Sequence, residues 1–148
     1  MTKLRDYRTT VVQEWIDYNN HLSEAFYVLI FGHATDAIMD QLGLGPQVSG
    51  SALFTVESHV RFLREIGLGT EVVVTAAVVQ VKEKTLHLAY EMVAGGEVVA
   101  TEEILLVHVA GAPARAVAFP APVAERLAAM LTGAPIPGWV GRAVGDLN

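Results

Sequence analysis

Residues 23–45 read SEAFYVLIFGHATDAIMDQLGLG, and this stretch decides the fold. Ser23 supplies an N-cap and Glu24 a first-turn acid, and the run that follows is rich in Ala, Leu, Ile and Met without a proline. Gly43 readily takes the left-handed conformation of a helix C-cap, and a Gly-Pro pair follows it. The sequence therefore predicts a helix over Ser23–Leu42, about 30 Å long.

The first half of this helix is apolar on every side, over residues 26–31. A helix that lies on a protein surface keeps one polar face, so other elements must wrap this one. A curved antiparallel sheet is the simplest wrapping, provided that the rest of the chain supplies enough strands.

Strand patterns stand on both sides of the helix. We expect one strand before it, at Tyr7–Gln13, and four after it, at Leu53–Leu63, Glu71–Val81, Thr85–Ala94 and Glu97–Val109. Gly95-Gly96 predicts a two-residue hairpin because both positions accept a positive φ. The four strands after the helix are expected to form a meander. The predicted fold class is α+β, with one antiparallel sheet wrapped around one long central helix.

The C-terminal part is expected to lie outside this core. Pro122 can open a short helix with Val123, Leu127 and Leu131 on one side. Residues 133–148 are rich in Gly and Pro and predict a coil, with Trp139 and Val140 as docking points. We therefore divide the chain into a domain over residues 1–132 and a tail over residues 133–148.

Composition excludes several classes of protein. The chain has 148 residues, 10 Lys and Arg against 16 Asp and Glu, a net charge of −6 and no cysteine. The scattered cations give no footprint for nucleic acid, and the longest apolar runs are too short for a membrane span. Neither a secretory signal nor a disulfide framework is present, so a cytoplasmic location is expected.

The polar loop before the helix reads DYNNH at residues 17–21. Its spacing to the helix and strands resembles the hotdog-fold acyl-CoA thioesterases of the 4-hydroxybenzoyl-CoA thioesterase-like group, over most of residues 9–109. In that group a loop Asp precedes the central helix and an aromatic residue often stands ten positions later, a spacing that Asp17 and Tyr27 hold. Related plant acyl-carrier-protein thioesterases carry D-x-N-x-H here, and Asp17, Asn19 and His21 fit it in full.

Three longer segments narrow the resemblance. EWIDYNNHLSEAFYVLIFGHATDAI, FTVESHVRFL and EKTLHL are similar to the thioesterases of carnitine breakdown, which act on betainyl-CoA. One departure is Asn20, because the wider group usually has Gly there. The resemblance implies a single hotdog domain with an acyl-CoA substrate.

Thioester hydrolysis needs a carboxylate that either attacks the carbonyl carbon or deprotonates the attacking water. Asp17 is the catalytic candidate for either role. Backbone N–H groups at the helix start, around Ser23 and Glu24, suit the developing oxyanion. Asn19 and His21 are expected to assist, by orienting Asp17, holding water or donating to the thioester oxygen, and the sequence leaves these roles open.

A second polar set lies on the strand predicted at Leu53–Leu63, where Glu57, His59 and Arg61 share one face. The resemblance implies that Glu57 and His59 lie across a subunit interface from Asp17 and bind substrate, and a salt-bridge ladder between subunits is the alternative. Aromatic residues near the loop form either an ordinary core or a box for a quaternary ammonium group. They are Trp15, Tyr18, Phe26, Tyr27, Phe31 and Phe54.

Coenzyme A is expected only as part of the substrate, and no other cofactor is implied. An acidic protein needs a local cationic patch for its phosphates, and the candidates are Arg61, Arg64, Lys82, Lys84 and Arg115. His33, Asp36 and Asp40 share a helical stripe, but no fourth ligand with metal spacing accompanies them. We therefore expect no metal site.

The strand at Glu71–Val81 has valines on both faces, and one helix cannot cover both. We therefore expect a homodimer or a dimer of dimers. Two other functions stay open. One is a non-catalytic hotdog protein that binds acyl-CoA, and the other is a hotdog dehydratase of 3-hydroxyacyl thioesters, whose proline-rich approach to the helix this loop lacks.

Overall fold

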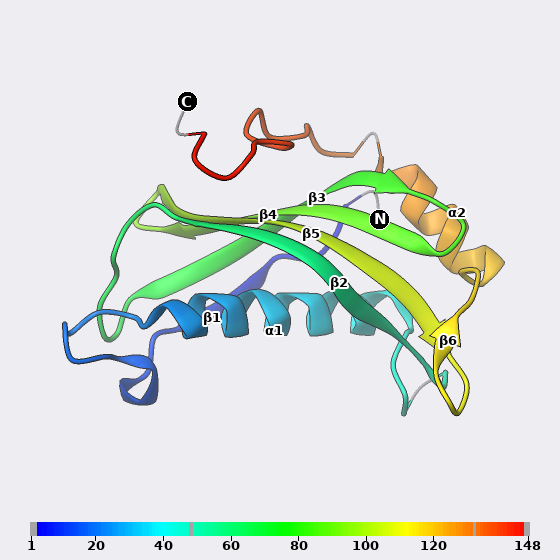
Figure 1. Ribbon diagram of the computed structural model, residues 1–148, viewed down its shortest axis with the longest axis horizontal. Helices are drawn as coiled ribbons and strands as arrows, with labels where there is room; N and C mark the ends of the chain where they lie inside the picture. The colour runs from blue at the N-terminus through cyan, green and yellow to red at the C-terminus, as the bar shows by residue number, and fades with distance from the viewer. Residues whose placement is uncertain (1–2, 48, 132, 147–148) are drawn as a thin grey trace.

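In the computed structural model the long helix lies along the concave side of a curved antiparallel sheet (Figure 1). The structure describes residues 3–47, 49–131 and 133–146, and the boundary predicted after residue 132 lies outside this set. The elements are β1 (Tyr7–Thr10), the 3-10 turn η1 (Gln13–Trp15), α1 (Glu24–Leu42), β2 (Ser51–Phe62), β3 (Glu71–Val81), β4 (Thr85–Ala94), β5 (Glu97–Ala110), β6 (Arg115–Ala116) and α2 (Ala121–Met130).

The order of the strands corrects one prediction. The sheet runs β1-β3-β4-β5-β2, with β6 added to the end of β5. Only β3, β4 and β5 form a meander. β2 does not pair with β3, the next strand in the chain, but with the edge of β5 that faces away from β4. The loop over residues 63–70 therefore carries the chain from one edge of the sheet toward the other. Alternation of apolar residues cannot distinguish these two edges, which is why the four-strand meander was wrong.

Most element bounds agree with the sequence patterns. β3 and β4 have the predicted bounds, and Gly95 and Gly96 both take positive φ, at 57° and 79°, as the hairpin requires. The first strand is shorter than predicted. It ends at Thr10, and the chain turns at Gln13 into η1.

α1 packs one face on the sheet and leaves the other open in the single chain. Its sheet-facing side chains are buried, and Phe31 stacks on Tyr90 with ring centroids 5.7 Å apart. Val28 and Leu29 are 44% and 38% exposed on the other side. The expected wrapping is therefore complete on one face only. The helix ends as predicted, because Gly43 has a φ of 72° and donates its N–H to the Asp40 carbonyl.

α2 follows at the side of the sheet. A proline occupies its first turn as predicted, and Val123, Leu127 and Met130 are buried. Leu131 is 39% exposed, so its expected place on the buried side is wrong. Met130 takes that place because the helix ends there and Leu131 serves as its C-cap.

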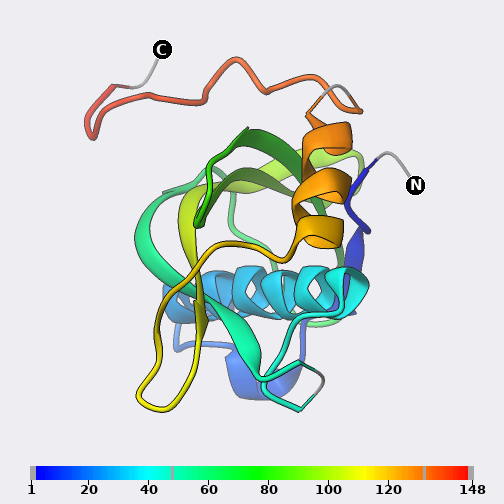
Figure 2. The ribbon, with the colours of Figure 1, turned by 90° about the vertical axis from the view of Figure 1, so that its right-hand side faces the viewer.

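The segment over residues 133–146, here called the C-terminal segment, crosses the side of the sheet opposite α1 (Figures 1 and 2). Trp139 fixes it, since its indole N–H donates to Glu91 Oε2 at 2.8 Å, which confirms Trp139 as a docking point. Within the described ranges no helix is long and apolar enough to cross a membrane.

Candidate active site

The loop between η1 and α1 holds Asp17 in a tight turn. Its N–H donates to the His21 carbonyl at 3.0 Å, and its carbonyl accepts from Asn20 N–H at 3.0 Å. Asp17 Oδ1 accepts from Asn19 N–H at 2.8 Å, which makes an Asx turn. One carboxylate oxygen thus fixes the turn. The other, Oδ2, accepts no hydrogen bond from the residues that the structure describes.

Asn20 closes the turn in the left-handed conformation, with a φ of 63°. Among the described residues, Asn20 is the only residue other than glycine with a positive φ. Asn adopts this conformation more readily than most residues do. The backbone at this position therefore suits the Gly of the resemblance as well as the Asn of this chain.

The same loop leads into an uncapped helix start. Ser23 stands at the N-cap position, but its side chain makes no capping hydrogen bond, which departs from the predicted cap. The N–H groups of Glu24 and Ala25 find no acceptor in the described part of the chain. Such N–H groups carry the positive end of the helix dipole, and they can stabilise a developing negative charge.

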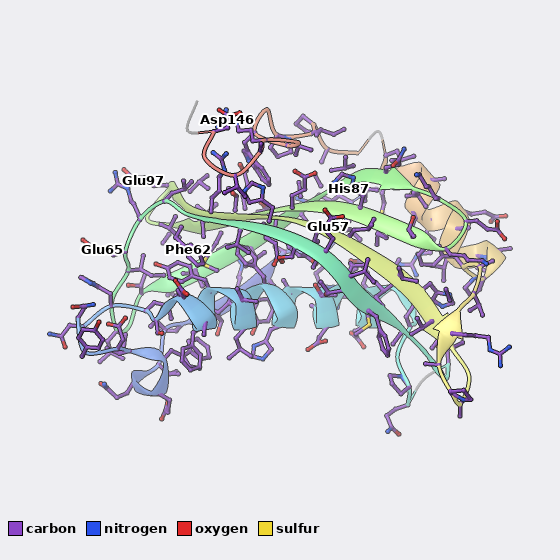
Figure 3. All side chains as sticks on the ribbon, in the orientation of Figure 1. Glu57, Phe62, Glu65, His87, Glu97 and Asp146 are labelled. Atoms are coloured by element: carbon purple, nitrogen blue, oxygen red, sulfur yellow. The ribbon has the colours of Figure 1, made fainter. Side chains whose placement is uncertain are left out.

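A pocket of about 730 Å³ opens in front of this helix start. Its far wall is the chain that leaves β2, which the Leu22 N–H anchors by donating to the Ile66 carbonyl at 2.8 Å. Figure 3 shows Phe62 and Glu65 at the end of the molecule where α1 begins. The lining residues are Asp17, Asn19, His21, Leu22, Glu24, Tyr27, Phe62, Leu63, Arg64 and Glu65.

Two contacts join the two walls. His21 Nδ1 lies 3.4 Å from Glu65 Oε2, and the Tyr27 hydroxyl donates to the Arg64 carbonyl at 2.8 Å. Tyr27 also meets Phe62 edge to face, with centroids 5.3 Å apart. Burial raises the pKa of the Tyr27 hydroxyl, and the negative charge of Glu65 raises it further. Tyr27 is therefore a neutral donor that ties α1 to the chain after β2.

Five predicted site residues thus meet in one pocket, namely Asp17, Asn19, His21, Glu24 and Tyr27. Ser23 lies beside them in the chain but does not line the pocket. Glu57 and His59 line a different pocket, across the sheet from α1. Phe54 stands on β2 opposite Val107, next to Leu53, whose N–H contacts Met39 near the end of α1. The single chain does not bring these three residues to Asp17.

The aromatic residues do not form one cluster. Trp15 stacks on Phe26 at 6.1 Å, Phe31 is in the core against Tyr90, and Tyr18 is 94% exposed. Within one chain, Tyr27 is the member of the predicted set that lines the Asp17 pocket. Phe31 is therefore a core residue, and the six aromatic residues do not form a box within one chain.

Sequence reasoning missed Phe62, Leu63 and Glu65 as pocket residues. All three lie at or just after the end of β2, and the long-range hydrogen bond between Leu22 and Ile66 brings them to the loop. No local pattern signals that contact. The only local indication was that Glu65, a charged residue, follows the strand predicted at Leu53–Leu63.

Two of the cations considered for the phosphates of coenzyme A have partners within the chain. Arg64 Nη1 lies 2.8 Å from Glu97 Oε2, and Arg61 donates to the carbonyls of Ala143 and Asp146. On α1, His33 contacts the Tyr7 hydroxyl and Asp40 pairs with Arg5. Two of the three residues in the helical stripe of His33, Asp36 and Asp40 thus have partners outside the stripe.

The model of the Thioesterase-like superfamily matches residues 11–127, which includes the loop, α1 and every strand from β2 to β6. The chain belongs to this superfamily. Among curated relatives, the betainyl-CoA thioesterase of Pseudomonas aeruginosa is 39% identical over 96% of this chain and 94% of its own length. The fold is accordingly a single hotdog domain, and the chain is a thioesterase of this superfamily.

Two solved structures have a similar fold over nearly the whole chain. A Pseudomonas putida KT2440 protein, provisionally described as a thioesterase, is 39% identical with a TM-score of 0.84, and the match covers 97% of each chain. A Staphylococcus aureus protein solved in complex with CoA is 28% identical with a TM-score of 0.87. That match covers 99% of this thioesterase and 98% of the other chain.

Proposed function

We propose that this thioesterase hydrolyses an acyl-CoA thioester in the Asp17 pocket. One observation carries the proposal. A carboxylate with a free oxygen and an uncapped helix start face the same pocket, only one loop apart. These are the base or nucleophile and the oxyanion site that thioester hydrolysis requires.

The chemistry follows from these positions. The thioester carbonyl oxygen takes up negative charge toward the N–H groups of Glu24 and Ala25, while water attacks the carbonyl carbon and Asp17 accepts its proton. The carbon–sulfur bond then breaks, and coenzyme A leaves as the thiol once its sulfur has gained a proton. Attack by Asp17 itself, followed by hydrolysis of the anhydride, uses the same residues. His21, held beside Glu65, is the group that orients water against Asp17.

The charge of the pocket favours a cationic acyl group. Asp17, Glu24 and Glu65 line it, whereas the nearby Arg64 guanidinium is paired with Glu97. The trimethylammonium of a betainyl group lies one carbon from the thioester carbonyl, so it must bind in this same pocket. Carboxylates and the faces of Tyr27 and Phe62 suit a quaternary ammonium ion. Betainyl-CoA is therefore the proposed substrate.

We further propose a homodimer formed through β2. This twelve-residue strand is an edge of the sheet, and Phe54 and Val56 on it are 51% and 57% exposed. A long edge strand with unpaired backbone groups and exposed apolar side chains is a template for pairing with another strand. The dimer was predicted from β3, but the outward valines of β3 are half-buried, and the open apolar surface lies on β2 and α1.

In such a dimer, Glu57 and His59 of the partner subunit are proposed to approach Asp17. A dimer of dimers and a cytoplasmic location stay part of the proposal. The support for the location is a composition without cysteine, which needs no oxidising compartment.

The test is release of free thiol from a panel of acyl-CoAs, with Asp17→Asn beside the wild type. The chain has no cysteine, so it adds no background to a disulfide reagent. We expect kcat to fall about 100-fold or more in Asp17→Asn and to stay unchanged in the control Glu125→Gln, an exposed residue of α2. Saturable binding without turnover across the panel would instead identify a binding protein.

The acyl group is tested with a neutral isostere. Betainyl-CoA and 3,3-dimethylbutyryl-CoA differ by nitrogen in place of carbon, so they have nearly the same shape and differ by one charge. We expect kcat/KM to be at least about tenfold higher for betainyl-CoA, with the ratio falling as salt is added. Equal values would remove the charge argument and leave hydrolysis itself intact.

A further inference from the structure

A second pocket of about 480 Å³ lies on the side of the sheet away from α1. We call it the outer pocket. Figure 3 shows two of its residues, Glu57 and His87, on the face over which the C-terminal segment runs. Within one chain, the Asp17 pocket shares none of its residues. The outer pocket is therefore a separate feature of the molecule.

Cross-strand register builds its floor. Gln80, His87, Leu105 and Glu57 are partners in one row across β3, β4, β5 and β2, and Glu103 and His59 are partners two rows further on, on the same face. The register shifts between Val78 and Gln80 on β3 and between Thr55 and Glu57 on β2. Bulges re-aim the side chains that follow them, and here both lie at the pocket's rim.

The C-terminal segment supplies the roof. Gly141 N–H donates to Glu103 Oε1 at 2.7 Å, and Trp139 is held two residues earlier by Glu91. Arg61 donates to the Ala143 carbonyl just beyond. These contacts place Arg142 at the pocket, where it is one of the lining residues.

Three charged side chains of the outer pocket have no ion pair with the described residues, namely Lys82, Arg142 and Glu57. Both oxygens of Glu103 are used, because Oε2 lies 2.7 Å from His87 Nε2 and Oε1 accepts from Gly141. Lys82 and Arg142 make no ion pair or side-chain hydrogen bond with the residues described. The outer pocket therefore brings together two cations that have no carboxylate partner.

We propose that the outer pocket binds a phosphorylated nucleoside. Lys82 and Arg142 face the phosphate, and His59 lies beside them on the β2 side. Glu57 and Gln80 offer acceptors for sugar hydroxyls or an exocyclic amine. The volume is within the range of sites that take small organic ligands. The nucleoside is either a free nucleotide or the nucleotide end of a coenzyme A, and the two share this chemistry.

This inference goes beyond hydrolysis at Asp17 and does not depend on it. Asp17→Asn protein is expected to bind the nucleotide as the wild type does, because Asp17 does not line the outer pocket. Loss of turnover with intact nucleotide binding would therefore concern the Asp17 pocket alone.

The experiment is calorimetric titration at low salt with adenosine 3′,5′-bisphosphate. The test variant is Lys82→Gln with Arg142→Gln, and the matched control is Lys3→Gln with Arg126→Gln. The control removes the same charges from exposed positions that do not line the pocket. We expect Kd to rise about tenfold for each cation lost from the pocket, the scale of a charge-assisted hydrogen bond, and to change little in the control.

Titration of coenzyme A and of 4′-phosphopantetheine separates the two sources. Coenzyme A weakened by the test variant, with phosphopantetheine unaffected, assigns the pocket to the nucleotide end of coenzyme A. Bisphosphate weakened with coenzyme A unchanged assigns it to a free nucleotide. No saturable binding of the bisphosphate, or equal loss in both double variants, overturns the proposal.

Discussion

His21 Nδ1 lies 3.4 Å from Glu65 Oε2, across the Asp17 pocket from one wall to the other. His21 belongs to the loop before α1, and Glu65 to the loop after β2, so the contact joins chain segments more than forty positions apart. A carboxylate beside an imidazole fixes its tautomer and its orientation. We therefore propose that Glu65 is a positioning residue that acts through His21.

Glu65→Gln removes the charge and keeps the size of the side chain. On the neutral substrate 3,3-dimethylbutyryl-CoA, which has no cation for Glu65 to bind, we expect kcat to fall about tenfold with a smaller change in KM. The control is Glu14→Gln, an exposed glutamate of η1 that is absent from the pocket. An unchanged kcat in Glu65→Gln would mean that the pair has no part in turnover.

Tyr27→Phe tests the tie between α1 and the chain after β2. The substitution removes the 2.8 Å hydrogen bond to the Arg64 carbonyl and keeps the ring contact with Phe62. We expect a loss of about 1 kcal/mol in the free energy of unfolding, measured by urea denaturation. Tyr18→Phe is the matched control, since Tyr18 is 94% exposed. Equal stability of the two variants would contradict the role of this hydrogen bond.

Features that neighbouring residues decide could be predicted from the sequence. Local signals predicted the ends of α1, the bounds of β3 and β4 and the Gly95-Gly96 turn, because a few neighbouring residues decide each of them. The loop motif likewise identified Asp17, Asn19 and His21, which the Asx turn holds together.

What the sequence missed depends on contacts between distant segments. Pairing of β2 with β5 instead of β3 decides that residues 62–65 meet the Asp17 loop, and no periodicity carries that information. The outward side of α1 could not be assigned either, because Val28 and Leu29 are exposed in one chain and a second chain would be needed to cover them.

Glu102 makes the stability depend on pH. It is 3% exposed, Ser58 Oγ donates to its Oε2 at 2.9 Å, and no described residue pairs with Oε1. Burial raises its pKa from 4.5 to about 7. The native state therefore holds a proton that the unfolded state has lost between these values. Stability must fall as pH rises through this window, and the full cost is present above about pH 7.

Glu102→Gln should remove that dependence. We expect the variant to match the wild type near pH 4.5 and to exceed it at pH 8 by up to about 3 kcal/mol in the free energy of unfolding. Urea denaturation across this range measures it, with the exposed Glu125→Gln of α2 as control. A constant difference at all pH values would show that packing, and not titration, separates the two proteins.

Asn20 tests the backbone of the loop. Its φ of 63° is costly for residues with a Cβ and no local polar group. We expect Asn20→Ala to lower the free energy of unfolding by about 1 kcal/mol and Asn20→Gly to leave it nearly unchanged. Should both variants lose the same stability, the side chain of Asn20, and not its conformation, would be responsible.

The proposed dimer is tested at Val56, which is 57% exposed on the edge strand β2. A lysine there places a charge where a second β2 would pair, and natural proteins use this device to block edges. By light scattering we expect about twice 15.9 kDa for the wild type and about 15.9 kDa for Val56→Lys. The control Ile136→Lys, 49% exposed on the C-terminal segment, should keep the wild-type mass. If Val56→Lys is monomeric and loses turnover while its fold persists, the partner subunit contributes to the site, whereas an active monomer would place the whole site in one chain.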